Sequence, residues 1–256
     1  MEAPGNVQRA AWVGTRGHPP PARASAYHLP GMTTPPPPVR DFAPVNGARL
    51  HYELQGDGFP VVLLHGGLLD LRLWDGQVGP LAQHFTTLRY DQRGFGKTVA
   101  PEGPYAPHED LRALLDHFSM DRAHVVGLSF GGRVALDFAL AWPERVSCLV
   151  LAAPEWTLDD MRGLAEVHPP RFLEPPAFTR LEQLLMPTLV VVGDRDNPVL
   201  LSNAELLARR VPTLTRVTLP GVGHPPNLER PEDFNRVLLD FLLAQASASV
   251  GEAPLG

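Results

Sequence analysis

Two hydrophobic periodicities alternate along the chain from about residue 41 onward. Short apolar runs rich in Val and Leu are separated by longer segments in which apolar residues recur every three or four positions. The short runs are typical of buried strands, and the longer segments are typical of amphipathic helices. Strands that alternate with helices indicate βαβ units, so the pattern predicts an α/β fold with a mainly parallel sheet flanked by helices.

The same pattern predicts the order of the elements. An antiparallel hairpin is expected over 40–56, because Asn46-Gly47 is a strong two-residue turn between alternating segments. Six further strands are expected within residues 60–67, 86–98, 124–127, 145–154, 186–196 and 215–220. Helices are expected within residues 76–85, 108–118, 131–142, 200–210 and 231–246. Pro143 is expected to end the third of these helices, and Pro231 to begin the last.

Proline marks the segments that leave this pattern. Nine of the 29 prolines fall in the first 40 residues, so 1–40 is predicted to be a disordered extension, with Met32 as a possible true start. A second group, Pro169, Pro170, Pro175 and Pro176, lies in 155–185, which is interpreted as a short lid. The expected organisation is one domain over 41–246 with this lid inserted, followed by a flexible tail over 247–256.

Composition narrows the function classes. A chain of 256 residues suits one larger α/β domain, and 44% hydrophobic with 20% charged residues is typical of globular proteins. The net charge of −6 argues against nucleic acid or an anionic membrane as a partner, and no apolar run approaches the roughly 20 residues that span a bilayer. The single cysteine, Cys148, is expected to be a buried, inert thiol. A cytoplasmic location is therefore expected.

Candidate chemistry begins at the turn before the third helix. Gly127-Leu128-Ser129-Phe130-Gly131 fits the pattern G-x-S-x-G, in which a sharp strand-to-helix turn exposes the serine hydroxyl above the sheet. The apolar strand before it and the helical face after it match the context that the pattern requires. The alternative is a tight turn with an incidental serine.

A serine hydroxyl needs a base, and the base needs a carboxylate that fixes its tautomer. His224 lies on a loop between the last predicted strand and the last helix. Asp194 and Asp196 follow the strand before it, and Glu155 follows an earlier strand. The residues alone leave all three acids open as the partner of His224.

Four motifs together resemble the α/β-hydrolase fold superfamily, in its branch of serine esterases and enol-lactone hydrolases. They are HGG at 65–67, DQRGFG at 91–96, GLSFGG at 127–132 and GDRD with GVGH between 193 and 224. The resemblance implies an eight-stranded sheet over 41–246 and a catalytic triad of Ser129, Asp196 and His224. It also implies an oxyanion hole built from the backbone amides of Phe130 and Gly67, with Leu68 as the alternative to Gly67. In similar proteins the residues at His65 and Asp91 brace the loops of the site.

The expected reaction is hydrolysis of a carboxylic ester or lactone through an acyl-enzyme, without a cofactor or metal. The same triad would serve a cofactor-free haloperoxidase or perhydrolase, or a carbon–carbon bond hydrolase, and some similar proteins are non-catalytic receptors for small molecules. The short lid favours turnover in a comparatively open site. Four side chains are candidates for the substrate pocket, although each also fits a role in core or lid packing: Leu68, Trp74, Trp156 and Phe172. The oligomeric state is left open.

Overall fold

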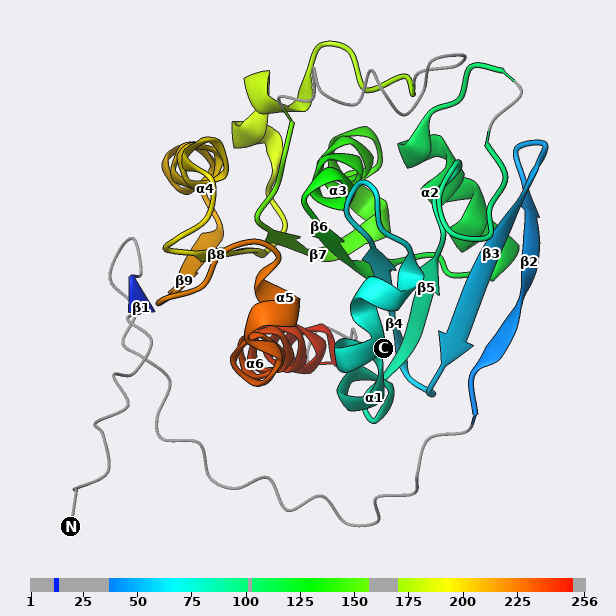
Figure 1. Cartoon of the computed structure of the whole chain (residues 1–256), viewed down its shortest axis with the longest axis horizontal. Helices are drawn as coiled ribbons and strands as arrows, with labels where there is room; N and C mark the ends of the chain where they lie inside the picture. The colour runs from blue at the N-terminus through cyan, green and yellow to red at the C-terminus, as the bar shows by residue number, and fades with distance from the viewer. Residues whose placement is uncertain (1–11, 14–36, 101–102, 157–169, 251–256) are drawn as a thin grey trace, which may run out of the picture.

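The computed structural model describes residues 12–13, 37–100, 103–156 and 170–250 (Figure 1). Most of the predicted N-terminal extension lies outside these ranges, as do residues 157–169 of the predicted lid and 251–256 of the predicted tail. The domain boundary expected at residue 41 falls two residues inside the first strand of the hairpin, which begins at Val39.

A single mixed sheet of nine strands forms the centre of the described chain. Its order is β1-β9-β8-β7-β6-β4-β5-β3-β2, and the six strands from β9 to β5 in this order are parallel. The strands are β1 (Trp12–Val13), β2 (Val39–Val45), β3 (Ala48–Gln55), β4 (Phe59–Leu64), β5 (Phe85–Tyr90), β6 (Ala123–Leu128), β7 (Val146–Ala152), β8 (Thr188–Gly193) and β9 (Leu214–Leu219). The eight predicted strands are thus confirmed. The two-residue β1 adds a ninth, antiparallel to β9.

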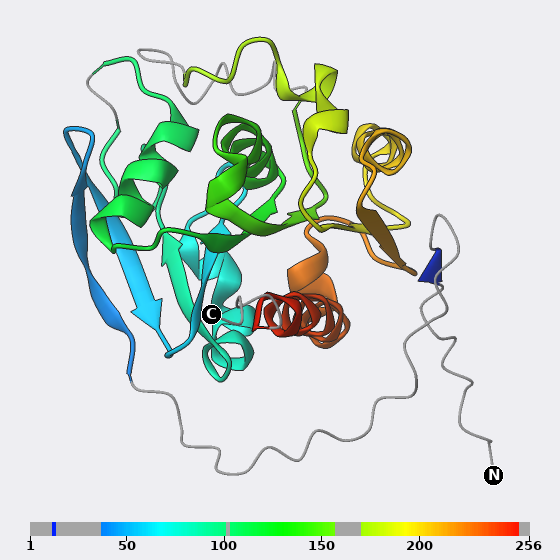
Figure 2. The ribbon, with the colours of Figure 1, turned by 180° about the vertical axis from the view of Figure 1, so that it is seen from behind.

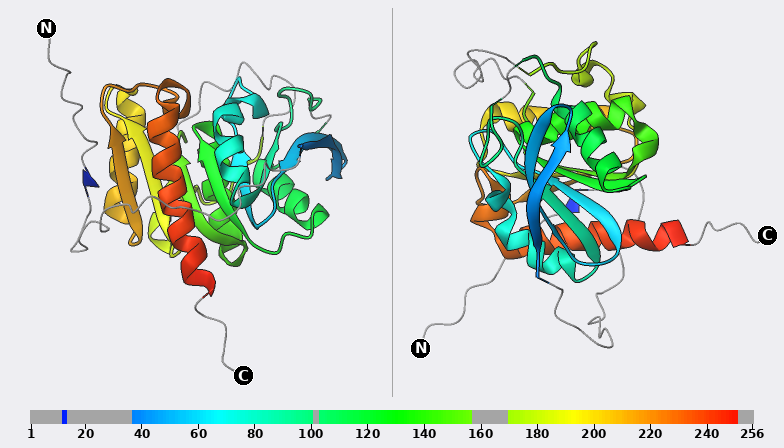
Figure 3. Two further views of the ribbon diagram at one scale, coloured as in Figure 1. Left: turned by 90° about the horizontal axis from the view of Figure 1, so that it is seen from below. Right: turned by 90° about the vertical axis from the view of Figure 1, so that its right-hand side faces the viewer.

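The antiparallel edge arises from the predicted hairpin. β2 pairs with β3 in a register that places Val45 opposite Ala48, with Asn46 and Gly47 as the two turn residues. Asn46 has φ 46° and Gly47 has φ 78°, which are the left-handed conformations that a type I′ turn requires and that Asn and Gly tolerate best. The hairpin lies at the edge of the molecule facing the viewer in the right-hand panel of Figure 3.

Helices cover both faces of the sheet (Figures 1 and 2). α2, α3 and α4 lie on one face, while α1 and α6 lie on the other, where α6 runs beside α1 (Figure 3, left). The α-helices are α1 (Asp75–Ala82), α2 (Pro107–His117), α3 (Phe130–Ala141), α4 (Pro198–Arg210), α5 (Pro226–Glu229) and α6 (Pro231–Val250). Short 3₁₀ turns are η1 (Leu71–Trp74), η2 (Pro143–Arg145), η4 (Ala177–Thr179) and η5 (Leu181–Gln183). Within the described ranges, no helix combines the length and apolar character needed to cross a membrane.

The central strands are buried on both faces, which explains their continuous apolar runs. In β4, Val62 and Leu64 pack in the core beneath α2 and α3, whereas Val61 and Leu63 pack in the core beneath α1 and α6. All four side chains are fully buried. Because parallel strands all end at the same edge of a sheet, the loops after β4, β6, β8 and β9 meet at that edge.

A buried histidine and the single cysteine form a contact between β6 and β7. Nδ1 of His124 lies 3.0 Å from Sγ of Cys148, and the imidazole packs against the rings of Phe59 and Phe85. Burial lowers the pKa of His124 to about 4, and the positive charge of Arg122 acts in the same direction. Burial also raises the pKa of the Cys148 thiol. The expected burial of Cys148 is confirmed, and both side chains are neutral at pH 7.

The neutral state of His124 predicts a loss of stability in mild acid. An unfolded histidine binds its proton near pH 6.5, whereas native His124 binds it only near pH 4. Between these values the unfolded state binds more protons, so the free energy of unfolding falls as the pH is lowered through this window, by up to about 3 kcal/mol. Urea denaturation of wild type and His124→Phe at pH 4 to 7 measures the effect, and the variant is expected to flatten this part of the profile.

The exposed His117 provides the control, because His117→Gln leaves the buried imidazole in place. The profile of His117→Gln is expected to match that of wild type. An equally steep profile in His124→Phe and wild type would contradict the assignment to His124.

Candidate active site

Ser129 occupies the turn between β6 and α3 in a conformation that is rare for a residue with a side chain. Its φ is 52° and its ψ is −117°. Such a conformation costs on the order of 1–3 kcal/mol and occurs most often at functional sites. Ser129 is the N-cap residue of α3, yet its side chain makes no capping hydrogen bond. The half-buried hydroxyl is therefore not used to stabilise the helix.

Glycines on both sides of Ser129 allow the chain to make this turn. A Cβ on Gly127 would collide with the carbonyl oxygen of Gly131, and a Cβ on Gly131 would collide with that of Leu64. β6, α3 and β4 therefore approach one another more closely than any other residue would permit. The approach also brings the loop after β4 to the serine, because a Cβ on Gly66 would lie 3.5 Å from Cβ of Ser129.

The backbone of Ser129 is also tied to neighbouring segments. Its N–H donates to the carbonyl of Ala152 at the end of β7, over 2.9 Å. Its carbonyl accepts from the N–H of Gly132, over 2.9 Å, and from that of Glu155, over 3.2 Å. These hydrogen bonds hold the strained turn in place from both sides.

Asp196 and His224 are brought into contact from two different loops. Nδ1 of His224 lies 3.4 Å from Oδ2 of Asp196. The Asp196 carboxylate is completely buried, while the His224 side chain is 33% exposed. The second carboxylate oxygen of Asp196 accepts from the N–H of Asn197, over 2.7 Å. A buried acid thus faces one ring nitrogen of a partly exposed histidine, an arrangement that can orient the ring.

Asp194, the other acid after β8, has a different partner. Its carboxylate is exposed and accepts from the N–H of Gly221, over 2.7 Å. Asp194 therefore binds the start of the loop that carries His224, residues 220–225, here called the histidine loop. Glu155 contributes its backbone N–H to the turn at Ser129. Of the three acids left open by the sequence, the described contacts place Asp196 beside His224.

The histidine loop is held against the end of β8. Gly193 permits this approach, because a Cβ there would collide with the carbonyl oxygen of Val222. The N–H of Gly223 donates to the side chain of Glu229, over 2.8 Å. Glu229 carries no distinguishing signal in the sequence, since an acid five residues after a histidine resembles any exposed helix residue.

His65 braces the loop after β4 from inside. Its Nδ1 donates to the carbonyl of Gly66 over 2.8 Å, and its Nε2 accepts from the N–H of Gln92 over 3.0 Å. The Gln92 side chain donates in turn to the carbonyl of His65. Burial lowers the pKa of His65, so the ring stays neutral and can accept from Gln92.

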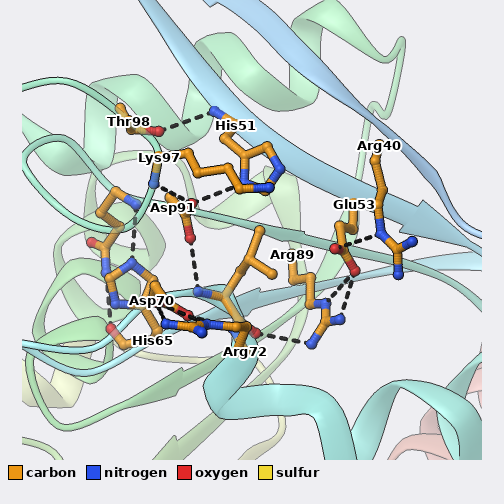
Figure 4. A network of polar contacts seen from close by, with 12 residues as sticks. Arg40, His51, Glu53, His65, Asp70, Arg72, Arg89, Asp91, Lys97 and Thr98 are labelled. Carbon is orange, nitrogen blue, oxygen red and sulfur yellow. Dashed lines mark hydrogen bonds and ion pairs between the residues drawn. The ribbon is translucent and has the colours of Figure 1, made fainter.

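Asp91 anchors three segments around this loop (Figure 4). Its carboxylate accepts from the N–H groups of Leu71 and Lys97 and contacts Nδ1 of His51, each over 2.8 Å. Gly96 is required beside it, because a Cβ there would collide with the carboxylate. These contacts agree with the interpretation of His65 and Asp91 as bracing residues.

The two segments expected to supply oxyanion amides both adjoin Ser129. Phe130 is the first residue of α3, so its N–H has no acceptor within the helix. In the loop after β4, Leu68 has φ 62° and is 73% exposed. A left-handed leucine is strained, so the loop at Gly67 and Leu68 is, after Ser129, a second place where a non-glycine residue takes positive φ next to the site.

The candidate pocket residues occupy different environments. Trp74 is fully buried beneath α1 and α6, where it packs against Phe234, so it fits the alternative interpretation as a core residue. Trp156 is buried on the opposite face. Phe172 is half-buried, with its ring edge-on to Phe130 and the Arg133 guanidinium 3.5 Å above it. Leu68 is exposed in the loop after β4, and Phe172 packs against Phe130, the residue that follows Ser129, so both remain candidates for the pocket.

Among the described residues, no group of three or more His, Cys, Asp or Glu side chains is arranged to hold a metal ion.

Comparison with known proteins gives consistent results. The family model for the alpha/beta hydrolase fold matches residues 60–176. An uncharacterised protein of Mycobacterium tuberculosis is 32% identical over 167 residues, which cover 61% of this chain and 49% of that protein. The chain thus matches about half the length of that relative.

Two further similarities extend over most of the chain. A 2-hydroxy-6-oxo-6-(2'-aminophenyl)hexa-2,4-dienoic acid hydrolase of Metapseudomonas resinovorans is 25% identical, with 81% of this chain and 92% of that enzyme covered. The crystal structure of the enol-lactonase from Burkholderia xenovorans superposes with a TM-score of 0.66 and 25% identity, over 79% of this chain and 99% of the lactonase. Together with the sheet topology and the strained serine turn, these matches show that the described part of the chain has the α/β-hydrolase fold.

Proposed function

We propose that the chain is a serine hydrolase that cleaves a carboxylic ester or lactone through an acyl-enzyme intermediate. The observation that carries the proposal is the turn at Ser129, which holds a non-glycine residue at positive φ while leaving its hydroxyl out of helix capping. Strain of this kind persists only where the surrounding structure enforces it. Asp196, buried beside His224, supports the assignment of the base and its acid.

In the proposed mechanism, Nδ1 of His224 carries its proton toward Asp196, which leaves Nε2 free to accept the proton of the Ser129 hydroxyl. The serine oxygen attacks the substrate carbonyl and forms a tetrahedral oxyanion, which the backbone amides of Phe130 and Gly67 stabilise. His224 then protonates the leaving alcohol, and the acyl-enzyme forms. Water attacks the acyl-enzyme with His224 again acting as the base, and Ser129 is released.

An ester or lactone is favoured as the substrate because a serine nucleophile and a neutral base suit an acyl carbonyl. The similarity to an enol-lactonase over 79% of the chain supports this class. Leu68 and Phe172 offer apolar surface for the acyl group. Small-molecule substrates, rather than a polymer, are proposed on the same grounds.

A carbon–carbon bond hydrolase is the second candidate. It is favoured by the similarity to the Metapseudomonas enzyme, whose name describes hydrolysis of a dienoic acid. The same triad would serve it, so the two candidates differ in substrate recognition.

Removal of the proposed nucleophile is expected to abolish activity without affecting the fold. Ser129→Ala should eliminate labelling by a fluorophosphonate probe and lower ester turnover by at least about 10³-fold. Its melting temperature should stay at the wild-type value, because the hydroxyl makes no capping bond. Turnover above a few per cent of wild type would rule out Ser129 as the nucleophile.

The two acids after β8 provide a matched pair of variants. Asp196→Asn should lower kcat by about 10³- to 10⁴-fold, because the amide cannot stabilise the protonated ring of His224. Asp194→Asn is the control, since it alters only the exposed contact with Gly221 and should reduce kcat by less than about tenfold. Steady-state kinetics on p-nitrophenyl acetate measure both, and a larger loss in Asp194→Asn would reverse the assignment.

A substrate series separates the two candidate functions. We expect p-nitrophenyl esters with short acyl chains, or a simple enol lactone, to be hydrolysed with a higher kcat/KM than a 2-hydroxy-6-oxohexa-2,4-dienoate. Ser129→Ala serves as the blank for background hydrolysis. A preference for the dienoate would replace the ester proposal with the carbon–carbon hydrolase.

A further inference from the structure

Three buried or partly buried amide side chains form one hydrogen-bond network where α5, α1 and α6 meet. They are Asn227 in α5, Gln77 in α1 and Asn235 in α6. Asn227 and Gln77 are both fully buried. A buried amide that loses its partners is destabilising, so such a group is strongly tied to one arrangement.

Asn227 connects this network to the histidine loop. It lies three residues after His224, in a helix of only four residues, Pro226–Glu229. A helix this short cannot be stabilised by its own hydrogen bonds. The Asn227 side chain instead donates to the carbonyl of Leu73 over 2.9 Å and to Oε1 of Gln77 over 3.0 Å. Gln77 returns a hydrogen bond to the carbonyl of Asn227 over 3.4 Å.

Leu73 and Gln77 connect this network to the loop between β4 and η1, residues 65–70, here called the oxyanion loop. Leu73 lies in η1, which begins directly after the loop that carries Gly67 and Leu68. The N–H of Leu71 at the start of η1 donates to Asp91, so η1 is fixed to the same frame as the loop. The histidine loop and the oxyanion loop are thus joined through η1 and the first turn of α1.

We propose that Asn227, supported by Gln77, is a positioning residue that sets His224 relative to the oxyanion loop. This proposal rests on the proposed function, in which His224 is the base and the amide of Gly67 or Leu68 binds the oxyanion. The transition state must contact both loops at once, so their separation affects the rate of the chemical step. Small displacements of catalytic groups lower rates by up to about 10²-fold.

The third amide distinguishes this role from simple attachment of α6. Asn235 accepts from Nε2 of Gln77 over 2.8 Å and donates to the carbonyl of Gly76 over 2.8 Å. Its contacts hold α6 to α1 but do not touch the histidine loop. Asn235→Ala therefore removes hydrogen bonds of the same chemical type from the same network without releasing α5.

The test compares Asn227→Ala with Asn235→Ala in the full chain. Each protein is assayed for kcat and KM on p-nitrophenyl acetate, for its rate of fluorophosphonate labelling and for its melting temperature. Asn227→Ala is expected to lose about 10- to 100-fold in kcat and in labelling rate, with KM within about threefold of wild type. Asn235→Ala is expected to keep the wild-type kcat even where its melting temperature falls.

A second variant covers the case in which Asn227→Ala does not fold. Gln77→Met keeps the side-chain volume and the bond from Asn227 to Leu73, but removes the hydrogen bonds of Gln77 with Asn227 and with Asn235. It is expected to lower kcat by a smaller factor than Asn227→Ala, and still by more than Asn235→Ala.

The outcomes separate this proposal from the proposed function. Equal kcat values in wild type and in Asn227→Ala or Gln77→Met, with wild type active, would overturn the positioning role alone. Equal losses of kcat in the Asn227 and Asn235 variants would overturn it as well, since they indicate a general structural effect. A wild type that is neither labelled nor active on any ester would refute the proposed function, and this role with it.

Discussion

The close approach of β6, α3 and β4 around Ser129 is the constraint on which the rest of the site depends. Only glycine at positions 127 and 131 permits it, because a Cβ at either position would collide with a backbone carbonyl. The approach forces Ser129 to positive φ and brings the loop after β4 next to it. The sheet can hold this strain because its central strands are buried on both faces by two large apolar cores.

Neutral hydrogen-bonding groups, more than ion pairs, fix the loops around Ser129. His65 is held neutral by burial and binds backbone groups on two segments. Asn227 and Gln77 join the histidine loop to η1 without burying a charge. Neutral amides fit this task because they are directional and cost less to bury than charges. Two buried carboxylates near the site, those of Asp91 and Asp196, each accept from backbone N–H groups and contact a histidine.

Much of the fold could be predicted because its determinants are local. The Asn46-Gly47 turn needs two left-handed residues, and the chain places there the two residue types that adopt this conformation most readily. The apolar runs of the parallel strands and the helical spacing of the segments between them follow from burial on one or two faces. The added strand β1 was missed, since two residues are too short to show any periodicity.

The sequence by itself determined the order of strands and helices along the chain and the sharp turn at Ser129. It also determined that His224 lies on a loop after the last strand. Each of these features depends on residues that are close together in the sequence. The residues alone left Asp194 and Asp196 open as the partner of His224, and the family resemblance favoured Asp196. The tertiary structure shows the contact, since it buries Asp196 beside His224 and leaves Asp194 exposed at Gly221. It also placed Trp74 in the core, because an aromatic residue that lines a pocket and one that packs beneath a helix occupy the same sequence pattern. The link between Asn227 and Gln77 joins residues 150 positions apart, so no local pattern could reveal it.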